Sequence, residues 1–92
     1  MNKADICSLR EGLIGELETI NEYNKLKMKC TDARVIKLFE SIIDEEKVHV
    51  GEFTRAIHKL CPYTEGKEME GMKEAEDIFA GKSEDDKPAP MI

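Results

Sequence analysis

The chain has 92 residues, of which 37% are charged and 5% aromatic, with no tryptophan and a net charge of −6. This length allows one small domain, and the acidic balance without a basic patch argues against a nucleic-acid partner. No apolar run is long enough to span a membrane. The charged composition and the long helical periodicity together predict an all-α fold.

The three cysteines are widely spaced and form neither a CxxC pair nor a zinc-ribbon pattern. No secretory leader is recognisable at the start of the sequence. We therefore expect a cytoplasmic protein with reduced thiols. Cys7 and Cys30 are expected to pack against other residues, whereas Cys61, which precedes Pro62, is expected to be exposed.

The first predicted helix runs from about Ala4 to about Lys29. Its inward positions recur in steps of three and four, the spacing of one helical face. These positions are Ile6, Leu9, Leu13, Glu16, Ile20 and Tyr23. Glu16 therefore interrupts an otherwise apolar stripe. Gly12 and Gly15 lie close to Glu16 along the helix. They either allow another backbone to approach closely or are glycines that the helix tolerates.

The second predicted helix runs from about Ala33 to about Leu60, with Thr31 or Asp32 as its N-cap. Cys61-Pro62 ends it, because proline cannot continue a helix. Its stripe has the same spacing and comprises Val35, Phe39, Ile42, Glu46, His49, Phe53, Ala56 and Leu60. A carboxylate and an imidazole thus interrupt the second stripe.

A further apolar line on the second helix comprises Ile43, Val50 and Ile57. It makes the apolar face wider than a two-helix seam requires, which predicts a partner subunit against this line. His58 lies off the inner stripe and is expected on the surface.

The rest of the chain is expected to hold one shorter helix and a tail. Pro62-Tyr63-Thr64 is expected to be a connector, with Thr64 capping a helix from Glu65 to about Ala80. Residues 81–92 are charged and proline-containing, and we expect them to be flexible. The predicted organisation is a helical-hairpin domain with a short third helix over residues 1–80, followed by a tail over residues 81–92.

Glu16, Glu46 and His49 together predict a metal site. Glu16 lies 15 positions before Thr31 and Glu46 lies 15 after it, so in an antiparallel hairpin both are about 22 Å from the turn. His49 follows Glu46 by three residues and therefore shares its face. An ionised carboxylate on an apolar face is costly unless it is paired or bound to a metal.

One hairpin supplies two carboxylates and one imidazole, which is half of a known ligand set. Two copies related by a two-fold axis would supply the four Glu and two His of ferritin-like di-iron bundles. A chain this short also buries too little surface alone. We therefore expect an antiparallel two-helix hairpin that dimerises into a ferritin-like four-helix bundle, as part of a homo-oligomer.

Oxygen-rich ligands with some imidazole favour iron, with manganese or zinc as substitutes. We expect Glu46 to bridge two iron ions, and Glu16 and His49 to be terminal ligands. The inward Tyr23 is either a hydrogen-bonding neighbour or radical trap beside the metals, or a packing residue.

Two segments resemble the encapsulated ferritins, short ferritin-like cargo proteins of encapsulin nanocompartments. They are Glu16-Leu17-Glu18-Thr19-Ile20-Asn21-Glu22-Tyr23 and Asp44-Glu45-Glu46-Lys47-Val48-His49. The resemblance covers roughly residues 5–75. It implies that Glu16, Glu46 and His49 are ferroxidase ligands and that Tyr23 lies near the metals.

The resemblance also implies an assembly and a partner. Dimers would form an annular decamer that oxidises Fe(II) to Fe(III) without storing it, and an encapsulin shell would hold the iron. The protein would then lie inside an encapsulin nanocompartment in the cytoplasm. The chain departs from the family at Gly15, where a second acid is common, and in its tail, which lacks a convincing apolar targeting motif.

Three other functions are compatible with the same residues. A rubrerythrin-like peroxide scavenger would share the centre, although the scattered cysteines do not form the cysteine-ligated iron domain that rubrerythrins add. A non-catalytic helical oligomerisation or adaptor module would use Glu16, Glu46 and His49 as a polar network that fixes register. A passive zinc or metal-binding protein would bind metal without consuming oxygen.

Overall fold

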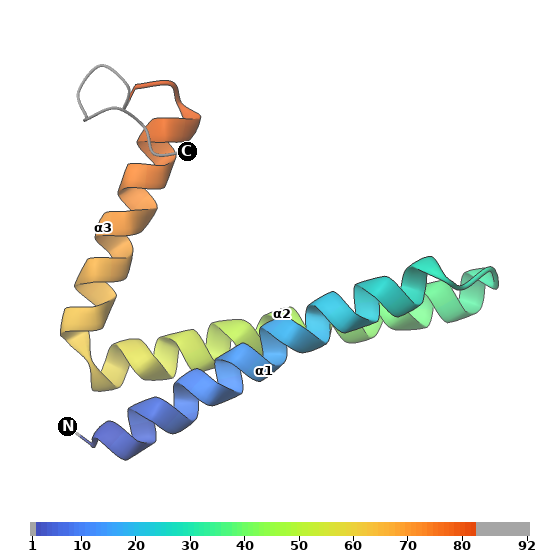
Figure 1. The fold of residues 1–92 in the computed structure, drawn as a ribbon, viewed down its shortest axis with the longest axis horizontal. Coiled ribbons are helices and arrows are strands. Elements are labelled where there is room, and N and C mark those ends of the chain that lie inside the picture. The colour runs from blue at the N-terminus through green and yellow to red at the C-terminus, as the bar shows by residue number, and fades with distance from the viewer. Residues whose placement is uncertain (1, 83–92) are drawn as a thin grey trace. The chain divides into compact units, whose positions relative to one another are not determined.

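The computed structural model describes residues 2–82, which form three helices and no strand. They are α1 (Lys3–Met28), α2 (Ala33–Leu60) and α3 (Pro62–Phe79), as Figure 1 shows. The predicted all-α class is confirmed, and the bounds expected for the first two helices agree to within one residue. None of the described helices combines the length and the apolar character that a membrane span requires.

The start of α1 is fixed by the side chain of Asn2, which was not predicted as a cap. Asn2 caps the helix, because its Oδ1 accepts hydrogen bonds from the backbone N–H of Ala4 at 2.9 Å and of Asp5 at 3.2 Å. Asp5 lies in the first turn and Lys25 and Lys27 lie in the last, which complements the helix dipole.

Asp32 is the N-cap of α2, which settles the choice between Thr31 and Asp32. Its Oδ1 accepts the Arg34 backbone N–H at 2.8 Å, and its Oδ2 accepts the Arg34 guanidinium at 2.8 Å. The hydrogen bond from the Arg34 side chain is the main reason that the pKa of Asp32 lies below its ordinary value of 3.8. These contacts fix where α2 begins, and hence the level at which its later residues meet α1.

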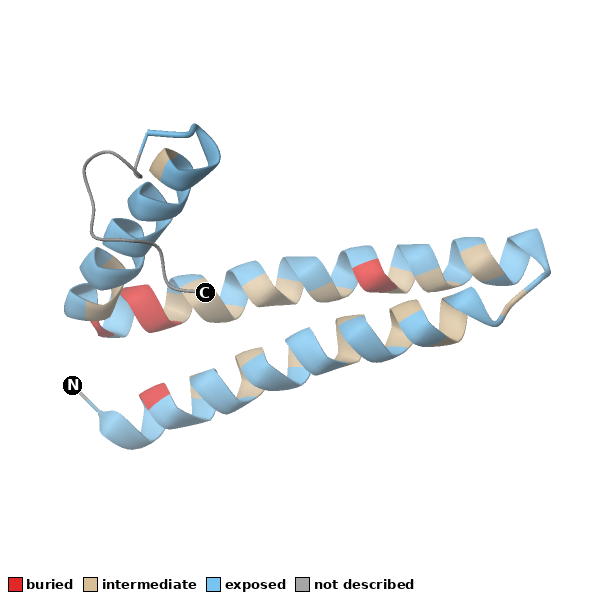
Figure 2. Cartoon of the chain, turned by 45° about the horizontal axis from the view of Figure 1, so that its top comes forward, coloured by how far each residue is buried: buried red, intermediate tan, exposed pale blue. Residues whose placement is uncertain are grey.

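The hairpin of α1 and α2 packs along the sides that the two helices turn toward each other, where the partly buried residues lie (Figure 2). Ile6 and Ile43 are both 4% exposed. Among the described residues, no large side chain is less than 2% exposed. The core of the hairpin is therefore shallow, as expected for two helices without a second layer.

The apolar line of Ile43, Val50 and Ile57 was expected to face a partner subunit, and this expectation was wrong for two of the three residues. Ile43 and Ile57 are buried within the chain itself, and for Ile43 the reason is that α1 packs against this side of α2. Large apolar side chains remain exposed elsewhere on the hairpin, at Ile14, Leu17, Val35, Leu38, Val48 and others. Apolar surface available to a second chain lies at those positions instead.

Three expectations near the end of α2 and the start of α1 were wrong. Cys61 and His58 are buried at 9% and 6% exposure, whereas Cys7 is exposed. His58 shares a helical face with Cys61 through its three-residue spacing, and the first turns of α1 lie beside Cys61, because Ile6 and Cys7 line a pocket with it. Cys30 is half-buried, and its thiol donates to the Leu26 carbonyl.

Helix α3 begins three residues earlier than expected. Pro62 occupies the first helical position, where its missing N–H costs nothing and its fixed φ suits the helix, so Thr64 lies inside the helix and not at its cap. The helix ends with Gly81 at φ 74°, and the Lys82 and Gly81 N–H groups donate to the Asp77 and Ile78 carbonyls.

The chain divides into two compact units, Met1–Cys61 and Pro62–Ile92. The first contains the hairpin and the second contains α3. The expected domain over residues 1–80 stays a prediction. The expected flexible tail lies largely over residues 83–92, outside the described part of the chain.

Candidate metal centre

The hairpin brings Glu16, Glu46 and His49 together. Glu16 comes from α1, and Glu46 and His49 come from α2. One ligand atom from each residue lies within 4.8 Å of the others. This follows from the short turn between the helices and from the three-residue spacing on α2, which places the last two side chains on one face.

The Nδ1 atom of His49 lies equally far from the two carboxylates. It is 3.4 Å from Glu16 Oε1 and 3.4 Å from Glu46 Oε2. Both separations exceed the roughly 2.9–3.0 Å typical of an N–H···O hydrogen bond, and one ring nitrogen carries at most one proton to donate. Two ligand atoms each about 2.1 Å from one metal ion lie about 3.0–3.4 Å apart, so the spacing of Nδ1 from each carboxylate is compatible with a shared ion, although the three ligand atoms together spread over as much as 4.8 Å.

The electrostatic setting also suits a cation. The Glu16 and Glu46 side chains are 21% and 17% exposed, while His49 is 43% exposed. Within residues 2–82, the ion pairs of these two carboxylates involve His49 alone and no lysine or arginine. Two carboxylates partly removed from water without a fixed cation gain most from a bound metal ion.

Tyr23 is half-buried and packs on an aromatic neighbour. Its ring lies 5.9 Å from that of Phe39, with the planes tilted by 57°, a geometry typical of favourable aromatic pairs. Packing on Phe39 is therefore its visible role, and a part in metal chemistry stays a prediction.

Phe53, which the sequence pattern places on the same stripe as His49, packs against Gly12 of α1. A Cβ atom placed on Gly12 would lie 2.6 Å from Phe53 Cε1 and 2.7 Å from Cζ, so the ring rests directly on the α1 backbone. Gly15 has nothing within 4 Å of the same position. The available signal was the spacing, because Gly12 precedes Glu16 by four residues and Phe53 follows His49 by four.

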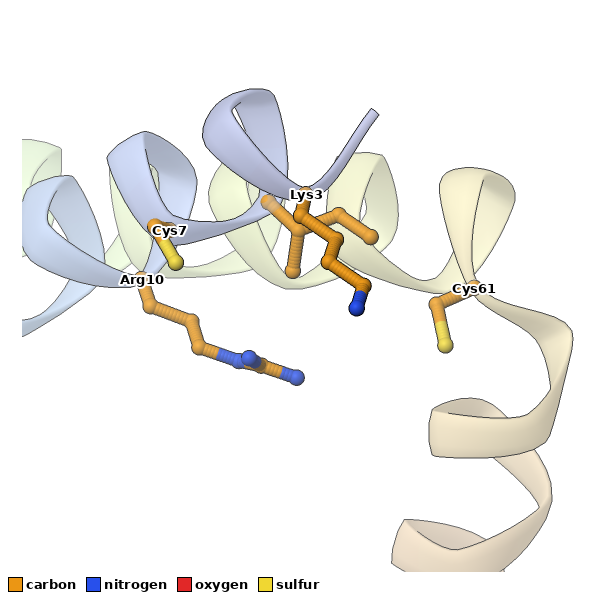
Figure 3. A pocket seen from close by; sticks show the side chains of 5 residues that line it. Lys3, Cys7, Arg10 and Cys61 are labelled. Carbon is orange, nitrogen blue, oxygen red and sulfur yellow. The ribbon is translucent and has the colours of Figure 1, made fainter. Parts of the chain in front are cut away.

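A separate pocket of about 260 Å³ lies near the start of α1. Figure 3 shows its labelled lining residues, Lys3, Cys7, Arg10 and Cys61, with Ile6 as the fifth. Ile6 precedes Glu16 by ten residues, which corresponds to about 15 Å along the helix. The lining shares no residue with the metal-ligand cluster, so this pocket is distinct from it.

The described helices α1 and α2 form a hairpin that carries a cluster of two carboxylates and one imidazole, a group of side chains that could hold a metal ion. No family model matches the chain, and no solved structure matches it. A ferritin-like–encapsulin shell fusion protein of Pyrococcus furiosus is 39% identical over 54 residues. The match covers 59% of this chain and 16% of that protein, so the similarity concerns a small part of the relative.

Proposed function

We propose that the chain is a ferroxidase that binds Fe(II) at Glu16, Glu46 and His49 and promotes its oxidation to Fe(III). The observation that carries this proposal is the convergence of three ligand atoms, from two helices, within 4.8 Å. The similarity to a protein named as ferritin-like adds support. Two carboxylates and an imidazole suit iron or manganese better than the thiolate-rich sites of structural zinc.

The complete centre is proposed to form between two copies of the chain. One copy supplies three ligands, and His49 keeps 43% of its side chain exposed. A second copy related by a two-fold axis would bring the set to four Glu and two His, the set of ferritin-like di-iron bundles. Four carboxylates carry a charge of −4, which two divalent ions neutralise.

Exposed apolar side chains near the cluster favour this pairing. Leu17 follows Glu16 directly and is 47% exposed, and Val48 precedes His49 and is 61% exposed. Burying them against a second hairpin would add to the shallow core of the single chain. The same association would shield the ligands from water and strengthen their hold on a cation.

Each side chain has a proposed part in the shared centre. Glu46, whose carboxylate offers two oxygens, would hold two ions, while Glu16 and His49 would each hold one. Fe(II), as the substrate, would supply the electrons that reduce dioxygen. The protein's own contribution is to hold the donor atoms in place, to neutralise charge, and to orient the His49 ring so that Nδ1 faces the cluster.

Assembly and location extend this proposal. The name of the Pyrococcus furiosus relative couples a ferritin-like part with an encapsulin shell. We take this as support for an encapsulin shell as partner of the present chain, with dimers grouped into an annular decamer. Iron oxidised by the chain would then be stored in the encapsulin compartment.

Anaerobic loading with Fe(II) followed by a pulse of oxygen tests the activity. The proposal predicts rapid growth of ferric absorbance with oxygen uptake in proportion to protein. Hydrogen peroxide supplied in place of oxygen distinguishes the rubrerythrin-like alternative, which predicts faster turnover with peroxide. Metal uptake without consumption of either oxidant would leave a passive metal-binding protein.

A further inference from the structure

The contact between Phe53 and Gly12 joins the two helices of the hairpin. The ring atoms Cε1, Cζ and Cδ1 of Phe53 lie 2.6, 2.7 and 3.2 Å from where a Cβ of Gly12 would stand. Real Cβ atoms essentially never approach other atoms as closely as the first two values. The ring therefore occupies space that only a glycine leaves open, and the contact is with the backbone of α1 itself.

This contact has the same register as the pairing of Glu16 with His49. Gly12 is four residues before Glu16 on α1, and Phe53 is four residues after His49 on α2, so each step is about one helical turn. Residues four apart also lie on the same helical face. The ring and the ligand pair are thus successive contacts along one seam.

We propose that Phe53 is a positioning residue for the metal-ligand cluster. Its ring, resting on Gly12, sets the separation of α1 and α2 one turn from the ligands and so sets how closely His49 approaches Glu16. This role rests on the proposed function, because the positions of the three ligands matter to the protein only if they bind metal. Its structural part concerns the metal-free hairpin and is testable without metal.

A methyl group on Gly12 tests this role directly. In Gly12→Ala the ring has to move, and because both helices are continuous through this seam, the displacement is passed to the ligand level one turn away. Gly15→Ala is the matched control. It makes the same chemical change on the same helix, next to Glu16, at a position with nothing within 4 Å.

Co(II) affinity, measured by titration of its visible absorption, is the first readout. Gly12→Ala is expected to weaken binding on the order of tenfold, the effect typical of lost support around metal ligands, whereas Gly15→Ala leaves it unchanged. The double variant Gly12→Ala with Phe53→Leu is expected to recover the affinity, because the smaller side chain leaves room for the methyl group. Circular dichroism checks that each variant is folded.

Crystal structures of the metal-free variants are the second readout. The separation of His49 Nδ1 and Glu16 Oε1, 3.4 Å in the unaltered chain, is expected to lengthen in Gly12→Ala and to return in the double variant. An unchanged separation, with the ring turned out into solvent, would overturn the proposal, as would unchanged Co(II) affinity in a folded Gly12→Ala. Absence of Co(II) binding by the unaltered protein would instead defeat the proposed function, and the crystallographic distance would then decide the positioning role alone.

Discussion

His49 Nδ1 lies 3.4 Å from Glu16 Oε1, although the two residues belong to different helices. The contact forms because the short turn after α1, closed by the Asp32 cap, brings α2 back along α1 in a fixed register. Glu46 completes the cluster from the same face of α2. The candidate metal centre is therefore a product of hairpin register, and changes in register should alter metal binding.

Replacing Glu46 with glutamine should abolish metal uptake without unfolding the chain. The amide keeps the shape of the carboxylate but removes its charge, and even loss of groups that only support ligands costs about ten- to hundredfold in affinity. Glu45→Gln is the matched control, because Glu45 is the neighbouring residue and is exposed. Anaerobic Fe(II) titration should show binding in Glu45→Gln and none in Glu46→Gln. Equal binding by the two variants would remove Glu46 from the site.

Glu46→Leu separates a metal site from a structural polar network. A leucine on this apolar stripe is expected to raise the free energy of unfolding of the metal-free protein by about 1 kcal/mol, since a carboxylate no longer has to leave water. The variant should also lose the stabilisation that metal gives, which is about 2.7 kcal/mol at a hundredfold excess over Kd. Urea unfolding with and without Mn(II) measures both effects. A protein that gains nothing from metal before the substitution would support the polar-network interpretation.

The Asp32 cap should make stability depend on pH in acid. Hydrogen bonds from Arg34 lower the pKa of Asp32, so its charged form is favoured by folding. This contribution is present above the unfolded value near 3.8 and is lost as the pH falls through the lower folded value. Asp32→Asn keeps a capping side chain but not the charge. The thermal midpoint of the unaltered chain should exceed that of the variant at neutral pH, and the difference should vanish in strong acid; a difference independent of pH would contradict this.

Tyr23 is expected to act through its ring. Tyr23→Phe keeps the contact with Phe39 and should leave stability, iron stoichiometry and oxidation rate unchanged. Tyr23→Ala removes the aromatic pair and should lower the free energy of unfolding by about 1–2 kcal/mol. Stopped-flow oxidation and urea unfolding provide the two measurements. Slower oxidation in Tyr23→Phe with unchanged iron binding would show that the hydroxyl group takes part.

The cluster could be predicted from the sequence because it depends on two regular properties of α-helices, the rise per residue and the periodicity. Glu16 and Glu46 are equally far from the turn, and His49 follows at helical spacing, so helical rise and periodicity suffice to bring them together. The bounds of α2 followed from the predicted cap at Thr31 or Asp32 and from the break at Pro62. Whether the ligands bind metal is a question that periodicity does not answer.

Other features depended on three-dimensional packing that periodicity does not describe. Cys61 is buried and lines a pocket with Ile6 and Cys7, and which residues of α1 meet the end of α2 depends on helix alignment over the whole hairpin. Proline stopped α2 as expected, but Pro62 also begins α3 at once. The glycine at position 12 suggested a close approach, and the structure identifies the group that approaches as the ring of Phe53.

Native mass spectrometry of the protein before and after anaerobic Fe(II) loading shows whether two chains share one metal centre. We expect even-numbered assemblies that take up two iron ions for every two chains, with metal favouring the paired species. Glu46→Gln, measured alongside, should take up none. An oligomer that binds no iron, with a distribution unchanged by its addition, would contradict the shared metal centre.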